Sequence, residues 1–185
     1  LSIISPYFVP GEQGTVVLTS AARNERSVRV LTNSLVANDV AAVHGGYSRY
    51  RKPLLEAGVQ IWELKPLTGG AAGSSFFGSS GASLHTKALA VDGRSLFVGS
   101  YNLDPRSAWL NCEQGVLVEN DALALQLEQI FQKQTDGEHA WHVTLADGKL
   151  SWSDGQEDLS KEPEASVGRR FQAWFARTFR LDAQL

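Results

Sequence analysis

The first third of the chain alternates between short apolar segments and longer segments with helical spacing. Three segments are rich in β-branched and other apolar side chains and are predicted to be strands: residues 1–9, 27–32 and 58–64. Two segments between them are predicted to be helices: residues 12–23, and a second segment that Asn38 and Asp39 can cap and that runs to Ala57 before Gly58. Strands that alternate with helices predict parallel β-α-β units within an α/β sheet.

The remainder of the chain adds hairpins and two more helices. Asp92-Gly93 separates two apolar runs, and Asp147-Gly148 separates two further runs in the same way. An Asp-Gly pair between alternating apolar residues is a strong hairpin signal. We therefore expect strands at residues 88–91, 96–98, 113–119, 139–145 and 150–152, helices at 122–133 and 163–181, and a loop at 156–164. The predicted fold class is α/β, with a mixed, largely parallel sheet flanked by helices.

The first of these hairpins carries a dense group of chemically active side chains. His85 and Lys87 lie at positions i and i+2 of an extended segment, so both point to one face. The second strand of the hairpin ends at Gly99-Ser100, and this turn can bring Asn102 back beside the two cationic side chains. An imidazole, an ammonium group and an amide that converge on one spot suit the tetrahedral oxyanion of a phosphodiester reaction.

The run His85-x-Lys87-x4-Asp92-x6-Gly99-Ser100-x-Asn102 resembles the HKD signature of the phospholipase D superfamily. Three further segments resemble the second HKD half of bacterial cardiolipin synthases: residues 5–10, 102–107 and 111–113. The resemblance extends over nearly the whole chain. It implies a phospholipase D-like fold and one HKD half-domain over residues 1–185, which includes an amphipathic helix at 163–181.

The resemblance also implies roles for the signature residues. His85 would be the nucleophile or the general acid and base, and we favour acid and base. Lys87 would neutralise a phosphate oxygen, and Asn102 would donate a hydrogen bond to the phosphoryl group. Glu113 would orient the imidazole, by the logic of a catalytic triad. Asp92 belongs to the signature and is a candidate catalytic residue, although a hairpin turn favours Asp for backbone reasons alone.

Three more residues are candidates for binding the substrate. Ser100 either donates a hydrogen bond to phosphate or only shapes its turn. Tyr7 lies at the end of a strand, where α/β sheets place their sites, and either lines the pocket or packs. His44 lies on a predicted helix and either contacts a substrate head group or is a hydrogen-bonded structural histidine.

No metal or cofactor is predicted. His139 and His142 have the spacing of metal ligands, but neither a cysteine pair nor a carboxylate set completes a site. The single Cys112 is expected to be a buried apolar residue. The Gly- and Ser-rich segment 69–83 is expected to be a surface loop or a lid whose Phe76-Phe77 pair shields the site.

Charge and length limit the function classes. A net charge of −3 and a pI near 5.8 give no overall attraction to nucleic acid or anionic lipid, so any attraction must be local. The helix at 163–181 carries arginines on one arc and aromatic residues on another, and it either lies on a membrane or packs by its aromatic face. The chain holds no Met and begins with Leu1, which favours a segment of a longer protein, and no apolar run approaches the ~20 residues of a membrane span.

These patterns favour a phosphatidyltransferase of the cardiolipin synthase type. Its substrates would be phospholipids such as phosphatidylglycerol and phosphatidylethanolamine, and its mechanism a metal-free double displacement through a phosphohistidine. The resemblance implies a second HKD half, in the same chain or in a partner copy, and a peripheral location on the cytoplasmic side of a bacterial inner membrane. Two alternatives stay open. One is a dimeric phosphodiesterase or nuclease, although the acidic composition disfavours nucleic acid as a substrate. The other is a half-domain that is not catalytic by itself.

Overall fold

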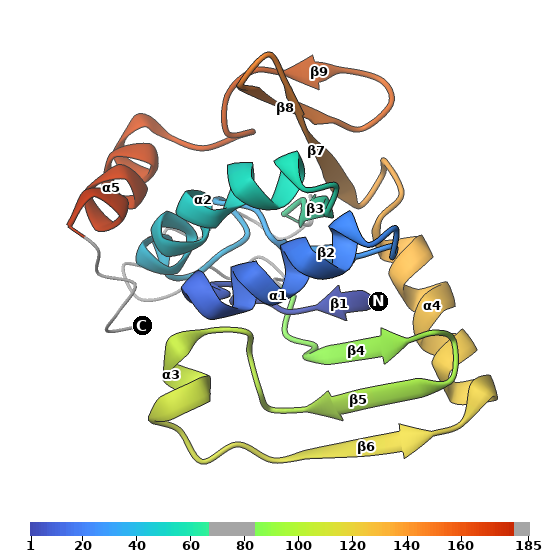
Figure 1. Ribbon diagram of the computed structural model, residues 1–185. Helices are drawn as coiled ribbons and strands as arrows, with labels where there is room; N and C mark the ends of the chain where they lie inside the picture. The colour runs from blue at the N-terminus through green and yellow to red at the C-terminus, as the bar shows by residue number, and fades with distance from the viewer. Residues whose placement is uncertain (67–83, 180–185) are drawn as a thin grey trace.

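The computed structural model describes residues 1–66 and 84–179, which form one open nine-stranded sheet with helices against it (Figure 1). The strands follow the spatial order β6-β5-β4-β1-β2-β3-β7-β8-β9. Their bounds are β1 (Ser2–Ile4), β2 (Arg29–Asn33), β3 (Gln60–Leu64), β4 (Ala88–Val91), β5 (Ser95–Gly99), β6 (Gly115–Glu119), β7 (Ala140–Ala146), β8 (Lys149–Ser153) and β9 (Asp158–Leu159). The helices are α1 (Gly11–Arg23), α2 (Ala41–Glu56), α3 (Pro105–Trp109), α4 (Asp121–Gln134) and α5 (Val167–Thr178).

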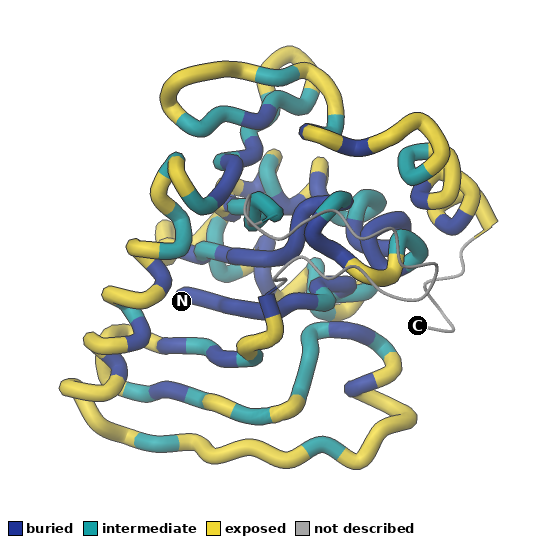
Figure 2. The backbone as a smooth tube through the Cα atoms, turned by 180° about the vertical axis from the view of Figure 1, so that it is seen from behind, coloured by how far each residue is buried: buried dark blue, intermediate teal, exposed yellow. Residues whose placement is uncertain are grey.

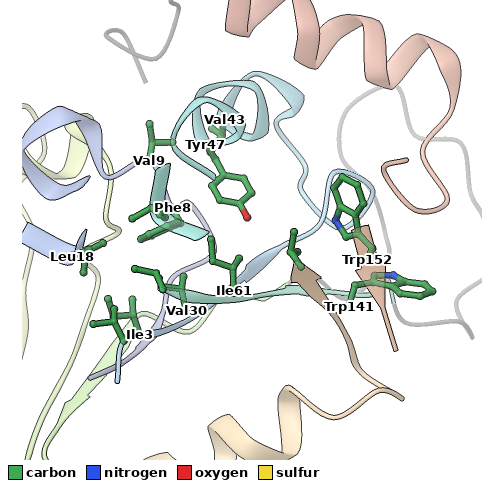
Figure 3. Packing of buried hydrophobic residues seen from close by; sticks show 14 residues of the cluster. Ile3, Phe8, Val9, Leu18, Val30, Val43, Tyr47, Ile61, Trp141 and Trp152 are labelled. Carbon is green, nitrogen blue, oxygen red and sulfur yellow. The ribbon is translucent and has the colours of Figure 1, made fainter. Parts of the chain in front are cut away.

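The three strands at the centre of the sheet are parallel and are joined by α1 and α2, as the alternating pattern predicts. Successive residues of a strand point to opposite faces. Ile3 and Val30 therefore pack with Leu18 of α1 and Tyr47 of α2 (Figure 3). Their neighbours on the other face pack with a second cluster that includes Phe131 of α4. Helices thus cover both faces of the central strands, which explains their nearly continuous apolar sequence.

The sheet is mixed, as expected, but it is not largely parallel. Two of the eight strand pairings are parallel, and the other six are antiparallel. Strands β4 to β6 extend the sheet beyond β1, and strands β7 to β9 extend it beyond β3 (Figure 1). Short connections join β4 to β5, β7 to β8 and β8 to β9, and a tight turn can only join antiparallel strands. The connection from β5 to β6 is longer and contains α3.

Both Asp-Gly pairs form the hairpin turns that the sequence predicts. Asp92 and Gly93 have φ values of 54° and 64°, and Asp147 and Gly148 have φ values of 50° and 71°. Positive φ at both central residues is the signature of the turn whose twist matches that of the strands. The register Val91↔Ser95 fixes the first hairpin, so its sequence signal was sufficient to place β4 against β5.

The helix ends differ from the sequence-based bounds. Asn38 accepts a hydrogen bond from the amide of Val40, 3.1 Å away, and α2 begins three residues later than Asn38 itself. Asn120 caps α4, so this helix begins at Asp121, one residue before the predicted start at 122. Ser166 caps α5, so this helix begins at Val167 rather than near residue 163. The loop expected at residues 156–164 contains the two-residue strand β9.

Helix α5 packs on α2 with the face opposite to its aromatic residues. Ala173 and Ala176 are its buried residues, and they lie against Gly45 of α2. Four aromatic side chains of α5 and its C-cap are exposed: Phe171, Trp174, Phe175 and Phe179. The alternative in which the aromatic face packs on the domain is therefore wrong, because only small residues allow the backbones of α2 and α5 to approach this closely.

Strand β6 forms one edge of the sheet and is largely exposed (Figure 2). Val116 and Leu117 are 63% and 71% exposed. Cys112, just before this strand, is exposed as well, which contradicts the expectation of a buried thiol. The proposed lid with Phe76-Phe77 lies outside the described residues. No helix within residues 1–66 and 84–179 is long and apolar enough to cross a membrane.

Candidate active site

A cavity of about 280 Å³ lies where the β4–β5 hairpin meets the ends of β1 and β2. Four predicted site residues from the signature region line it: His85, Lys87, Ser100 and Asn102. Tyr7 and Glu113 line it as well, together with Pro6, Asn33, Asp39, Leu84 and Asn111. The extended spacing and the hairpin therefore bring together the residues that the sequence pattern placed on one face.

The backbone beside His85 is fixed by a buried asparagine at the end of β2. The side-chain oxygen of Asn33 accepts a hydrogen bond from the Leu84 amide at 3.0 Å. Its side-chain nitrogen donates to the Leu84 carbonyl at 3.3 Å and to the Pro6 carbonyl at 3.5 Å. The described residues give the exposed His85 imidazole no hydrogen-bond partner. The histidine is thus presented to the cavity on an anchored backbone, and no residue within 1–66 and 84–179 binds either ring nitrogen.

Lys87 lies beside His85 and donates a hydrogen bond from its Nζ to the His85 carbonyl, 2.8 Å away. Burial lowers the pKa of the Lys87 ammonium, although Glu113 and Asp104 oppose the shift. A partly desolvated ammonium interacts more strongly with an anion than a fully hydrated one. Lys87 is therefore placed to neutralise a phosphate oxygen in the cavity.

Glu113 precedes β6 and is held by two neighbours. One carboxylate oxygen accepts a hydrogen bond from the Ser100 hydroxyl, and the other accepts from Nδ2 of Asn111 at 3.1 Å. These hydrogen bonds lower the pKa of the Glu113 carboxyl. In this arrangement Glu113 contacts Ser100 and Asn111 rather than the His85 ring, so its role in orienting the imidazole stays a prediction.

Asn102 follows β5 and reaches the cavity from a tightly anchored loop. Its backbone amide donates to the Ser107 hydroxyl at 3.3 Å, and the next amide, of Leu103, donates to the Ser5 hydroxyl at 3.1 Å. Asp104 caps the short helix α3 by accepting from the Ser107 amide at 2.6 Å, rather than pairing with Arg106. Within the described chain, the side-chain oxygen of Asn102 is buried without a partner.

Tyr7 contributes a hydroxyl group to the rim of the cavity. It donates a hydrogen bond to Oδ1 of Asp39 at 2.6 Å. Burial, together with this carboxylate, raises the pKa of the Tyr7 hydroxyl above its usual range. Tyr7 is therefore a neutral hydrogen-bonding group at the cavity mouth. This position agrees with the alternative in which Tyr7 lines the pocket.

Two predicted site residues lie elsewhere. Asp92 occupies the hairpin turn at the far end of β4 from Lys87, and it does not line the cavity. Its positive φ supports the backbone explanation for an aspartate at this position. His44 is 1% exposed on α2 and pairs through Nε2 with Glu162 at 3.3 Å, well away from the HKD residues. It is a buried, hydrogen-bonded histidine rather than part of this cavity.

The structure adds three polar residues that the sequence pattern did not single out. Asn33 follows a buried parallel strand, and a polar residue at the carboxyl end of such a strand is a recognisable signal for a site. Asp39 and Asn111 gave weaker signals. Asp39 was expected only to cap a helix, and Asn111 lay in the resembling segment 111–113 without a predicted role. All three reach the cavity from different elements of the fold.

Taken together, the cavity offers an imidazole, a cationic ammonium group and amide and hydroxyl donors within one small volume. This combination suits nucleophilic or acid-base chemistry at a phosphodiester, whose equatorial oxygens carry the negative charge. The fold and the site together define a phospholipase D-type HKD domain. The chain belongs to the family described as "Cardiolipin synthase, PLD-like domain", which matches residues 1–135.

Known proteins similar to this chain agree with that class. Cardiolipin synthase C of Escherichia coli (strain K12) is 42% identical over 179 residues, which cover 92% of this chain and 37% of that protein. Cardiolipin synthase A of Yersinia pseudotuberculosis serotype O:3 is 29% identical over 150 residues, which cover 81% of this chain and 26% of that protein. The chain thus spans well under half the length of these curated relatives.

Two solved structures share the fold. The phosphatidylserine synthase of Haemophilus influenzae Rd KW20 gives a TM-score of 0.58 at 17% identity, over 99% of this chain and 39% of that one. The phospholipase D family member Nuc from Salmonella typhimurium gives a TM-score of 0.57 at 15% identity, over 77% of this chain and 82% of that one. At these identities the likeness concerns the fold, and it agrees with the expected phospholipase D-like architecture.

Proposed function

We propose that this chain is one HKD half of a phosphatidyltransferase of the cardiolipin synthase type. The observation that carries the proposal is the convergence of His85, Lys87 and Asn102 in one cavity of a chain that belongs to this family. The substrates would be phosphatidylglycerol and phosphatidylethanolamine. The relatives named cardiolipin synthase support this choice over other phosphodiesters.

The reaction would be a double displacement at phosphorus. An imidazole nitrogen attacks the phosphorus of the first lipid, a phosphohistidine forms, and the bond to the leaving alcohol breaks. A hydroxyl group of the second lipid then attacks the phosphohistidine, which releases the imidazole and the new phosphodiester. We assign His85 to proton transfer, to the leaving oxygen in the first step and from the attacking hydroxyl in the second. Lys87 and Asn102 hold the phosphoryl oxygens in both steps.

A second HKD half is required, because the nucleophile and the acid stand on opposite sides of the phosphorus. Large apolar side chains close to the cavity support this requirement. Trp109 and Leu110, next to the cavity residue Asn111, are 76% and 72% exposed. Surface of this kind favours a partner. The partner would be a second half in the same polypeptide or another copy of the chain.

A lipid substrate is favoured by an apolar groove that meets the HKD cavity. The groove has a volume of about 590 Å³ and shares Asp39 with the cavity. Its other lining residues are mostly apolar and come from the start of α2 and from α5: Val40, Ala41, Ala42, Phe171, Gln172, Phe175 and Ala176. An acyl chain fits such a lining, whereas a polynucleotide needs a cationic groove.

Membrane contact would come from α5. Its exposed aromatic residues form an apolar face at the membrane surface, and the enzyme would be peripheral on the cytoplasmic side of a bacterial inner membrane. No metal or cofactor takes part in the proposed steps, since Lys87 and Asn102 supply the charge stabilisation.

The test uses the complete protein that contains this chain. It is incubated with vesicles of phosphatidylglycerol and phosphatidylethanolamine and, separately, with single- and double-stranded DNA, each with and without a strong chelator. We expect new phosphatidyl products that persist with chelator and disappear in His85→Ala. His139→Ala is the matched control, since the partly exposed His139 imidazole pairs with Asp136 and does not line the HKD cavity. DNA cleavage that depends on His85, with unchanged lipids, would replace the transferase by the nuclease.

A further inference from the structure

A second cavity, of about 540 Å³, lies between α2, α5 and the β7–β8 hairpin. It shares no lining residue with the HKD cavity. His44, Arg51 and Glu162 form part of its floor, and Trp174 of α5 stands at its side. The charged residues that line this cavity are one carboxylate, Glu162, and six cations: Arg51, Lys52, Lys149, Lys161, Arg170 and Arg177. We call this cavity the basic cleft.

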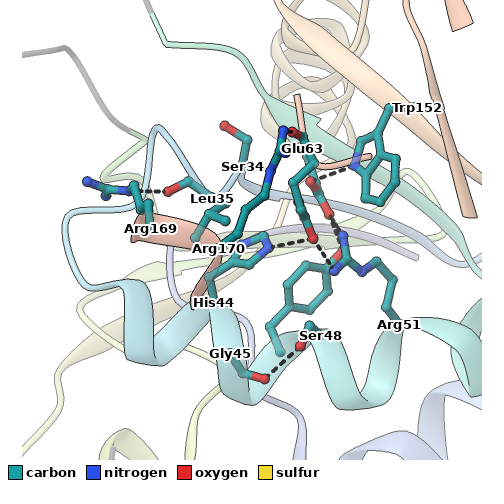
Figure 4. Close-up of polar contacts among 12 residues, drawn as sticks. Ser34, Leu35, His44, Gly45, Ser48, Arg51, Glu63, Trp152, Arg169 and Arg170 are labelled. Atoms are coloured by element: carbon teal, nitrogen blue, oxygen red, sulfur yellow. Dashed lines mark hydrogen bonds and ion pairs between the residues drawn. The ribbon is translucent and has the colours of Figure 1, made fainter. Parts of the chain in front are cut away.

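The floor of the basic cleft is a buried polar network (Figure 4). Arg51 is 2% exposed and pairs with Glu63 at 2.8 Å and with Glu162 at 2.6 Å. Glu63 also accepts hydrogen bonds from the Trp152 indole at 2.9 Å and the Tyr47 hydroxyl at 3.0 Å. Two carboxylates thus surround the one buried guanidinium, so these three groups carry a net charge of −1, which the five other cations of the cleft outweigh.

This network is poorly suited to bind a metal ion. His44, Glu63 and Glu162 offer ligand atoms that lie within 4.8 Å of one another. The Arg51 guanidinium, however, already binds both carboxylates. A divalent cation would have to displace or approach a buried cation, which is electrostatically unfavourable. The polar atoms of the floor therefore favour a different ligand.

The rim of the basic cleft carries positive charge that the described residues do not neutralise. Within that part of the chain, Lys149, Lys161 and Arg177 have no ion pair or side-chain hydrogen bond. Lys52 donates only to the Gly148 carbonyl, at 2.6 Å. The clustering is local, because the whole chain has a net charge of −3. Unpaired cations that cluster around one cavity of such a chain favour an anionic ligand.

Buried donors complete the cleft. Arg170 donates from Nη2 to the Glu162 carbonyl at 2.8 Å, while its Nε is buried without a partner among the described residues. An unpaired buried polar nitrogen is costly, and a bound acceptor removes that cost.

We infer that the basic cleft binds a phosphate-bearing ligand, separate from the phosphodiester that reacts in the HKD cavity. Phosphate supplies several acceptor oxygens and negative charge, and both match lysine and arginine donors. The group can belong to a phospholipid head group or to a soluble phosphate. Trp174, which is 55% exposed on the aromatic face of α5, places the cleft beside the surface that we assign to the membrane.

The experiment separates binding from turnover by using the complete protein with His85→Ala as the background. One variant carries Lys161→Glu and Arg177→Glu at the rim of the cleft. The matched control carries Arg26→Glu and Lys133→Glu, which change the net charge equally at exposed sites outside the cleft. Titration calorimetry measures binding of inorganic phosphate and glycerol 3-phosphate. Flotation measures binding to phosphatidylcholine vesicles with and without phosphatidylglycerol.

We expect the rim variant to weaken phosphate binding by about tenfold or more, because each charge-assisted contact contributes strongly, while the control stays unchanged. Loss of vesicle binding in the rim variant alone would assign the ligand to a lipid head group. Unchanged vesicle binding would assign it to a soluble phosphate. Absence of saturable binding, or equal loss in the rim and control variants, would overturn the inference without affecting the transferase proposal, which is tested with an active His85.

Discussion

Asn33 shows how a single buried amide positions the reactive histidine. Its side chain forms hydrogen bonds in both directions with the backbone of Leu84, the residue before His85. A third hydrogen bond links it to Pro6 on the neighbouring strand end. Asn33 does not act on the substrate itself in this arrangement. It acts as a positioning residue, because it fixes the backbone from which the imidazole reaches the cavity.

Replacement of Asn33 with Ala should lower kcat by about tenfold to a hundredfold, since small displacements of a reacting group are expensive. The loss of the buried amide should also cost about 1–3 kcal/mol of the free energy of unfolding. Initial transfer rates and urea unfolding of the complete enzyme measure the two effects. Asn33→Asp keeps the acceptor for Leu84 and should retain part of the rate.

Asp92→Asn is the control for that comparison. Asparagine tolerates the positive φ of the hairpin turn, and Asp92 does not line the cavity. We expect its rate to stay within a few-fold of the unmodified enzyme. A folded Asn33→Ala enzyme with a normal kcat, or an Asp92→Asn enzyme as impaired as His85→Ala, would contradict this division of roles.

The sequence predicts well which site residues meet when they are close along the chain, and poorly when they come from distant segments. His85, Lys87, Ser100 and Asn102 lie within one hairpin and its flanking turn, so strand spacing alone brings them together. Asn33 comes from another strand, and although its place at the carboxyl end of a buried parallel strand is a signal for a site, only the tertiary structure shows that it holds the backbone beside His85. His44 shows the same limit, since a helix position does not say which of two cavities the side chain meets.

Helix α5 shows the equivalent problem for an element. The helical period separates an arginine arc from an aromatic arc, but it does not determine which arc packs on the domain. The decision comes from Gly45 of α2, which leaves room only for the small residues Ala173 and Ala176. The directions of the strands were difficult to predict for a similar reason. The first third of the chain contains the parallel β-α-β units, but the hairpins at both sides of the sheet outnumber them and make the sheet mostly antiparallel.

Substitution of Gly45 with Ala should destabilise the contact between α2 and α5. The added Cβ would lie 2.5 Å from the Ala173 carbonyl oxygen and 3.0 Å from the Ala176 Cβ. Overpacking of this kind costs about 1–3 kcal/mol, which exceeds the gain in helix propensity of about 1 kcal/mol. Urea unfolding measures the loss, and hydrogen exchange of the α5 amides should locate it.

Gly168→Ala provides the matched control on the other helix. A Cβ at Gly168 meets nothing within 4 Å, so the same chemical change should be neutral or stabilising there. Equal stability of the Gly45 and Gly168 variants would show that α2 and α5 do not need their close approach.

At the scale of the whole molecule, Glu162 ties the segment before α5 to the buried network on α2 and β3. Burial raises the pKa of the Glu162 carboxyl, but His44 and Arg51 lower it more, and the net result lies well below the usual value of 4.5. The folded protein therefore binds this proton less readily than the unfolded chain does. The stabilisation is present above about pH 4.5 and is lost as the pH falls below it.

Glu162→Gln should consequently lower stability at neutral pH and flatten the loss of stability on acidification. Thermal unfolding between neutral pH and pH 3 measures both effects. Glu56→Gln, at an exposed position, should preserve the acid dependence of the unmodified protein. An unchanged acid slope in the Glu162 variant would mean that other carboxyls, such as Asp154 beside Lys65, dominate the acid response.

The arrangement of the sheet has a consequence for how such enzymes diverge. The family match ends at residue 135, before β7, and the rest of the described chain forms β7 to β9 and α5. Three parallel strands separate this part from the hairpin that carries His85. Insertions, deletions and exchanges of charge can therefore accumulate at one end of the sheet while the register at the other end is preserved. The proposed ligand cleft and the proposed reaction site therefore lie in parts of one fold that can change independently.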